Sequence, residues 1–184
     1  MKAKEAAAPL AGARRVLVIG SPGSGKSTLS AELARRCGLR YIPMDRAFFW
    51  LPGWRMRPRD EIRALIAEAI STDGWLIDGT GLNTLDLRLS RADLVIWLRL
   101  PRWLCMTRLL RRWLRFRGRT RPDMADDCPE RIDMAFLRYV WTFEREVAPQ
   151  IEKKLATTGA AANVIQLSTQ DEIDALLAET TATI

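Results

Sequence analysis

One glycine-rich segment near the start of the chain constrains the fold more than any other feature. It follows Arg15–Gly20, an apolar and β-branched run that is typical of a buried strand. The segment reads Gly20-Ser21-Pro22-Gly23-Ser24-Gly25-Lys26-Ser27-Thr28 and contains G-x-x-x-x-G-K-[ST] in full. Lys26–Cys37 then has the apolar spacing of a helix, which Gly38 is expected to end. This order of strand, loop and helix predicts a phosphate-binding loop.

Each residue type in this segment has a physical role in holding phosphate. The glycines let backbone N–H groups turn inward, and the start of the following helix adds a partial positive charge. Lys26 can reach the β- and γ-phosphates, and the Ser27 hydroxyl can ligate Mg²⁺. We therefore expect residues 20–28 to bind ATP or GTP with Mg²⁺. The alternative is a turn of the same shape that binds nothing.

Short apolar runs alternate with helical patterns along the rest of the chain. Strands are expected at Arg40–Met44, Trp75–Asp78, Leu94–Leu100 and Asn163–Leu167, and helices from Pro58, over Pro101–Arg117 and from Ile132. This alternation is typical of a parallel sheet with helices on both faces, an α/β fold of three layers. We expect a single domain over residues 14–184 after a flexible leader over residues 1–13.

Composition excludes several classes of protein. The chain has no histidine, which excludes a Ser-His-Asp triad and every histidine-based metal site. The cysteines Cys37, Cys105 and Cys128 lie far apart, so neither a zinc ribbon nor a disulfide framework is expected. No apolar run reaches the ~18 residues that span a bilayer. The first residues lack the apolar stretch of a secretory signal, so we expect a cytoplasmic protein without membrane contacts.

Carboxylates follow two of the expected strands. In a parallel sheet, ligands bind beyond the carboxyl ends of the strands. Asp78 ends one strand and is our first choice for holding Mg²⁺ through water. Asp45 follows the preceding strand and is better placed for a second substrate, as a hydrogen-bond acceptor or as a base for a hydroxyl. Either could instead be a helix cap or a turn residue.

Arginine dominates the second half of the chain. The net charge is +7, and residues 94–122 contain many arginines but no acidic residue. Arg108, Arg111, Arg112 and Arg115 fall at helical spacing on one face, where like charges repel unless an anion lies between them. Region 108–131 is therefore interpreted as a mobile lid over phosphates, since a compact polar loop follows the helix. A strip along a nucleic-acid backbone is the second choice, and a solvated face is the third.

Aromatic residues gather after the second strand, among them Trp50 and Trp54 with Pro52-Gly53 between them. Aromatic faces stack on bases and on guanidinium groups, so these two side chains could hold the acceptor substrate within region 45–72. An equally good interpretation is a hydrophobic hook that packs the loop onto the core.

These segments together resemble the adenylate kinase-like branch of P-loop kinases, and within it the bacterial DNA topology modulation protein family. The resemblance extends from about Arg15 to Leu155. It rests on the blocks Gly20–Thr28, Met44–Trp54, Trp75–Leu89, Leu100–Met124 and Cys128–Asp133. The first block is shared by many families, and the other four in this order are more specific.

The resemblance implies a P-loop NTPase core with a five-stranded parallel sheet, an acceptor region after the second strand and a short arginine-rich helical lid. It implies that Lys26 and Ser27 serve the phosphates and Mg²⁺. It places Arg112, Arg115 and Arg119 in the lid, and Arg131 just after it. One departure concerns the residues after Asp78-Gly79. Adenylate kinases have an arginine there that grips a monophosphate, whereas this chain has Thr80-Gly81-Leu82, and Arg88 is the candidate substitute.

We therefore expect a kinase that uses ATP and Mg²⁺ and transfers the γ-phosphoryl group to a nucleoside monophosphate or another small acceptor. The alternative is a nucleotide-dependent regulator that binds DNA and hydrolyses ATP weakly. Salt-dependent DNA binding separates the two functions.

Overall fold

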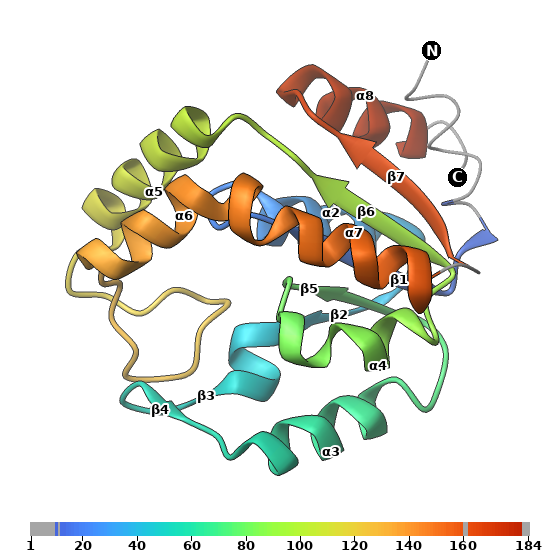
Figure 1. The fold of residues 1–184 in the computed structure, drawn as a ribbon, viewed down its shortest axis with the longest axis horizontal. Helices are drawn as coiled ribbons and strands as arrows, with labels where there is room; N and C mark the ends of the chain where they lie inside the picture. Colours follow the sequence, from blue (N-terminus) through green and yellow to red (C-terminus); the bar gives the residue numbers. More distant parts are fainter. Residues whose placement is uncertain (1–9, 11, 160–161, 182–184) are drawn as a thin grey trace.

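A five-stranded sheet forms the centre of the structure, a computed structural model that describes residues 10, 12–159 and 162–181 (Figure 1). The strand order is β2-β5-β1-β6-β7, and every neighbouring pair is parallel. The strands are β1 (Arg15–Gly20), β2 (Arg40–Pro43), β5 (Trp75–Asp78), β6 (Leu94–Leu98) and β7 (Asn163–Leu167). This is the parallel sheet that the alternating sequence pattern predicts, with β1 at its centre.

Helices cover both faces of the sheet (Figure 1). The helices are α2 (Lys26–Cys37), α3 (Arg59–Ala69), α4 (Leu85–Leu89), α5 (Arg102–Phe116), α6 (Met134–Glu146), α7 (Ala148–Thr157) and α8 (Gln170–Thr181). Helices α2 and α8 pack in one apolar cluster, and α3, α4 and α7 pack in the other. Helices α5 and α6 contact each other, and Leu109 of α5 joins the first cluster while Phe143 of α6 joins the second.

Strand β1 explains why the molecule has two apolar clusters. Its side chains alternate across the sheet, so Val16 and Val18 enter one cluster while Leu17 and Ile19 enter the other. All four are fully buried. A strand that is apolar on both faces has to be covered by helices on both sides, which confirms the three-layer arrangement.

Some elements differ from the sequence pattern. Strand β2 ends at Pro43 and β6 at Leu98, each slightly earlier than expected. A π-helical turn over Asp45–Phe49 and a hairpin of β3 (Trp50–Leu51) and β4 (Arg55–Met56) follow β2. These elements were not predicted because two-residue strands and a five-residue helix are too short to show a hydrophobic period.

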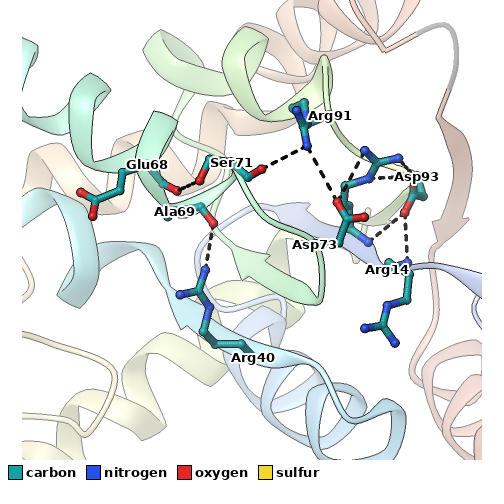
Figure 2. A network of polar contacts seen from close by, with 9 residues as sticks. Arg14, Arg40, Glu68, Ala69, Ser71, Asp73, Arg91 and Asp93 are labelled. Carbon is teal, nitrogen blue, oxygen red and sulfur yellow. Dashed lines mark hydrogen bonds and ion pairs between the residues drawn. The ribbon is translucent and has the colours of Figure 1, made fainter.

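The amino-terminal edge of the sheet is held by arginine and aspartate side chains (Figure 2). Asp93 accepts hydrogen bonds from the backbone N–H groups of Arg14 at 3.0 Å and Arg15 at 2.9 Å. Asp73 forms ion pairs at 3.8 Å with Arg15 and with Arg91. These charges stabilise the edge that lies opposite the phosphate loop, so they take no part in the site described below.

Most of the predicted leader lies outside the described residues. Leu10 and Ala13, which the structure does describe, are buried in the cluster beneath α2. Among the helices in the described part of the chain, none has both the length and the apolar character needed to cross a membrane.

Candidate active site

The phosphate loop joins β1 to α2 and packs directly against α5. Gly25 forms the N-cap of α2 with a left-handed φ of 95°. Gly23 has a φ of 80°, and a Cβ built on it would lie 2.4 Å from the carbonyl oxygen of Cys105. Glycine is therefore required at Gly23, both for the conformation and for the approach of α5. The Lys26 Nζ donates a hydrogen bond to the Ser21 carbonyl at 2.8 Å, so the amine is folded back over the loop.

Two side chains of this loop have polar atoms that could donate hydrogen bonds to an anion. The Ser24 hydroxyl is fully buried and has no hydrogen-bond partner within the described residues. Burial lowers the pKa of Lys26, while the nearby carboxylates of Asp78 and Asp45 raise it in part. A half-buried amine and a buried hydroxyl that has no hydrogen-bond partner within the described residues, both at the start of a helix, fit the oxygens of a triphosphate tail.

Asp78 lies at the carboxyl end of β5 and is 5% exposed. Its carboxylate accepts hydrogen bonds from the Tyr41 hydroxyl at 3.2 Å and from the Met44 N–H at 3.3 Å. Burial raises the pKa of Asp78, against the hydrogen bond from the Ser27 hydroxyl and the charge of Lys26, which lower it. Ser27 and Asp78 are thus neighbours, and a hydroxyl beside a carboxylate is a ligand set that fits Mg²⁺.

Asp45 is the first residue of the π-helical turn after β2 and remains accessible to solvent. Burial among the surrounding atoms nevertheless raises the pKa of Asp45, and the neighbouring Asp78 raises it further. Arg121 and Lys26 act in the opposite direction. Asp45 is therefore an exposed carboxylate that lies near enough to the Lys26 amine of the phosphate loop to be influenced by its charge.

Arg88 lies beneath the loop that follows β5 and is fully buried. Its Nη1 donates to the Gly79 carbonyl at 2.7 Å, and its Nη2 donates to the carbonyls of Thr80 at 2.7 Å and Gly81 at 3.1 Å. Burial lowers the pKa of Arg88 to about 9. Arg88, the predicted substrate ligand, thus supports the loop after β5, because both of its Nη atoms donate to backbone carbonyls.

The arginines of α5 do not share one face toward the site. Arg108 donates to the Ser24 carbonyl at 3.3 Å, and Arg112 forms an ion pair with Glu130 at 2.7 Å. Arg115 is exposed and lies over the ring of Phe116, while Arg119 is exposed beyond the helix end. The structure therefore brings Arg108 to the phosphate loop and Arg112 to Glu130, but leaves Arg115 and Arg119 at the surface.

The lid loop carries a compact network of charges. Arg121 pairs with Asp123 at 2.7 Å and with Glu130 at 2.5 Å. The charge of Asp123 reaches the site as well, where it helps to raise the pKa of both Asp45 and Asp78. The loop over residues 118–131 thus brings both signs of charge near Asp45.

The lid also contacts the β3–β4 hairpin (Figure 1). The Trp54 Nε1 donates to the Pro129 carbonyl at 3.1 Å, and the guanidinium of Arg131 lies 4.1 Å from the centre of the Trp54 ring. Trp50 packs edge-on to Trp54 at 5.1 Å, and both rings contact the buried lid residue Cys128 and its neighbours. Trp50 and Trp54 therefore pack against the loop over residues 118–131 and not onto the main core, so the described residues do not show the predicted hydrophobic hook onto the core.

Sequence reasoning missed several residues that the structure places in this site. They are Tyr41, Thr80, Asp123 and Glu130, whereas Arg108 and Arg121 were predicted as members of the arginine-rich lid region. Thr80 could have been found from the sequence, because it comes soon after Asp78 at the end of an expected strand. The lid residues could not, because which arginine meets which carboxylate depends on how the loop folds.

The sheet order and the phosphate loop define the fold of P-loop kinases. The chain is similar to shikimate kinase from Acinetobacter baumannii in complex with shikimate, with a TM-score of 0.59 and 13% identity over 96% of this chain and 94% of that chain. It is also similar to shikimate kinase from Bacteroides thetaiotaomicron, with a TM-score of 0.51 and 15% identity over 93% and 98% of the two chains. At such identities the likeness shows the fold alone. Neither the protein-family models nor the curated proteins gave a significant match.

Proposed function

We propose that this chain is a cytoplasmic, Mg²⁺-dependent phosphotransferase that moves the γ-phosphoryl group of ATP to a hydroxyl of a small acceptor. One observation carries the proposal. Lys26 of the phosphate loop and Asp45 after β2 lie close enough for the charge of each to shift the pKa of the other. An amine that would serve the donor phosphates and an exposed carboxylate that could serve an acceptor are therefore electrostatic neighbours.

The proposed step uses these groups directly. The Asp45 carboxylate takes the proton of the acceptor hydroxyl, and the hydroxyl oxygen forms a bond to the γ-phosphorus. The bond between that phosphorus and the bridging oxygen breaks, and ADP leaves with the electron pair. Lys26 and Arg112 hold the phosphate oxygens on the donor side. Mg²⁺, held by Ser27 and through water by Asp78, would neutralise charge on the phosphates.

The surroundings of Asp45 favour a hydroxyl over a nucleoside monophosphate as the acceptor. A monophosphate needs cationic groups to grip it and no base to activate it. Arg88 directs its donors to backbone carbonyls, and Arg46 donates to the Pro122 carbonyl at 3.0 Å. Asp45 and Asp123 add negative charge on the acceptor side. The predicted binding of the acceptor by Trp50 and Trp54, and the predicted catalytic role of Arg131 after the lid, belong to this proposal.

The enzyme is preferred to the DNA-binding regulator because α5 does not present a continuous cationic strip. Arg108 and Arg112 turn toward the phosphate loop and Glu130, which removes two charges from the outer face of the helix. Two solved structures of this fold are named as shikimate kinases, so transfer to a small acceptor is within its range. Membership of the topology modulation family stays part of the proposal and rests on the sequence blocks.

The test is a panel of sugars, polyols, amino alcohols and nucleoside monophosphates, each incubated with γ-labelled ATP and Mg²⁺. Transfer of label to a hydroxyl compound is expected, and Lys26→Ala is expected to abolish it while the circular dichroism spectrum stays unchanged. Lys153→Ala, an exposed lysine on α7, is the matched control. Label transferred only to monophosphates would contradict the proposed acceptor, and activity retained by Lys26→Ala would contradict the proposed site.

A further inference from the structure

We propose that Glu130 is a positioning residue for phosphoryl transfer. By pairing with Arg112 and Arg121 at once, it holds one arginine toward the donor phosphates and the other toward the acceptor. The inference rests on the proposed function, and it assigns a role to a lid carboxylate that touches neither substrate.

Glu130 is built into the lid as a buried bridge. Its side chain is 4% exposed, whereas Asp123 of the same loop is half-buried and Asp126 and Asp127 are exposed. One carboxylate oxygen, Oε1, accepts from the Arg112 Nε at 3.1 Å and Nη2 at 2.7 Å. The other, Oε2, lies 2.5 Å from the Arg121 Nε. Oε1 thus forms hydrogen bonds with Arg112, while Oε2 forms an ion pair with Arg121 without a hydrogen bond, so one carboxylate lies between the two guanidinium groups.

The two arginines act on different halves of the site. Arg112 lies near enough to the phosphate loop to lower the pKa of Lys26. Arg121 lowers the pKa of Asp45, the proposed base on the acceptor side. Glu130 therefore connects an arginine whose charge acts on Lys26 to an arginine whose charge acts on Asp45.

A carboxylate is needed at this position because the two arginines repel each other. Burial lowers the pKa of Arg112, and the positive charge of Arg121 is the next cause that lowers it. Arg121 has a second partner in Asp123, whereas Arg112 has its one ion pair within the described residues with Glu130. Without the negative charge, Arg112 would lose its orientation and the two guanidinium groups would separate.

This arrangement predicts opposite effects on binding and on turnover. Removing the charge of Glu130 leaves Arg112 without an ion-pair partner in the described part of the chain and Arg121 paired with Asp123 alone, so the lid attracts a polyanion at least as strongly as before. The same change lets the arginines leave the geometry that the transition state needs, and a misplacement of ~1 Å can slow a reaction by ~10²-fold. A purely structural residue would instead weaken binding and turnover together.

The experiment compares Glu130→Gln with the full-length unsubstituted chain. Binding of Mg²⁺ and the ATP analogue with an imido group between the β- and γ-phosphates is measured by calorimetry. Turnover is measured with the acceptor found in the panel, or as ATP hydrolysis where water is the acceptor. We expect kcat to fall ~10²-fold while the analogue binds no more weakly. Asp127→Asn is the matched control, since Asp127 is an exposed lid carboxylate at a φ of 54° that asparagine accepts.

A double-mutant cycle shows whether the effect passes through Arg112. In the Arg112→Ala background, Glu130→Gln is expected to cost much less turnover than in the unsubstituted chain. Equal losses in both backgrounds, unchanged kcat, or parallel losses of binding and turnover would each overturn the inference. An unsubstituted chain that binds no analogue overturns the proposed function and this inference together. If Glu130→Gln does not fold, Glu130→Asp takes its place. This variant withdraws the carboxylate by one methylene, and it is expected to lower kcat without weakening binding of the analogue.

Discussion

The Thr80 hydroxyl forms two hydrogen bonds with Gly20, accepting from its N–H at 3.0 Å and donating to its carbonyl at 2.8 Å. Gly20 is the last residue of β1 and the first of the phosphate loop, and Thr80 follows β5. A buried side chain therefore ties the loop after β5 to the loop that would hold the donor. These two hydrogen bonds therefore fix the start of the phosphate loop relative to the loop after β5.

Replacing Thr80 with valine keeps the shape of the side chain but removes both hydrogen bonds. The buried N–H and carbonyl of Gly20 then lose these partners, which costs roughly 2 to 4 kcal/mol of unfolding free energy. Urea denaturation measures this loss, and calorimetry with the imido analogue is expected to show weaker binding. Thr80→Ser keeps the hydroxyl and is the control. Equal stability of the valine and serine variants would contradict the role given to these hydrogen bonds.

The proposed base makes turnover depend on pH. Asp45 has to be deprotonated to accept a proton, and burial together with Asp78 raises its pKa above the ordinary value of 3.8. Activity is therefore expected to fall as the pH decreases through that raised pKa, with the acid limb of kcat/KM above pH 3.8. Asp45→Asn is expected to lower turnover by ~10²- to 10⁴-fold and to remove this limb. Asp126→Asn, an exposed lid carboxylate, is expected to keep the original profile.

The sequence was sufficient to predict the sheet and the phosphate loop because both follow local patterns. The apolar run of β1, the glycines and Lys26 carry their signal within a few residues. The ends of strands β2 and β5 also pointed to Asp45 and Asp78, because parallel strands bring their carboxyl ends to one edge.

The lid was much less predictable, because its contacts join residues that are far apart in sequence. Helical spacing placed Arg112 and Arg115 on one face, yet Arg112 pairs with Glu130 and Arg115 lies at the surface. A hydrophobic period reports which side of a helix is buried, and it says nothing about which carboxylate a guanidinium meets. Pairing of this kind is decided by the path of the loop over residues 118–131.

The different surroundings of Arg112 and Arg115 lead to a direct comparison. Arg112→Ala is expected to slow phosphoryl transfer by about 10²- to 10³-fold, as the loss of one fixed donor to developing charge does in other enzymes. Arg115→Ala removes the same charge from the same helix but at an exposed position, so turnover is expected to stay at the original level. Steady-state kinetics at one ionic strength measures both. Equal losses would indicate that the net charge of α5 matters, and that the position of Arg112 does not.

Trp54 is expected to hold the lid against the hairpin. Its backbone N–H donates to the Cys128 Sγ at 3.2 Å, its indole N–H donates to the Pro129 carbonyl, and its ring packs under Arg131. Trp54→Ala removes the ring and the indole donor, so amide hydrogen exchange over residues 118–131 is expected to accelerate. Trypsin should also cleave sooner after the exposed Arg119. Trp54→Phe keeps a ring but has no indole donor, so its exchange rate is expected to lie between those of the original chain and of the alanine variant. Exchange in the alanine variant that matches the original chain would show that other contacts hold the lid closed.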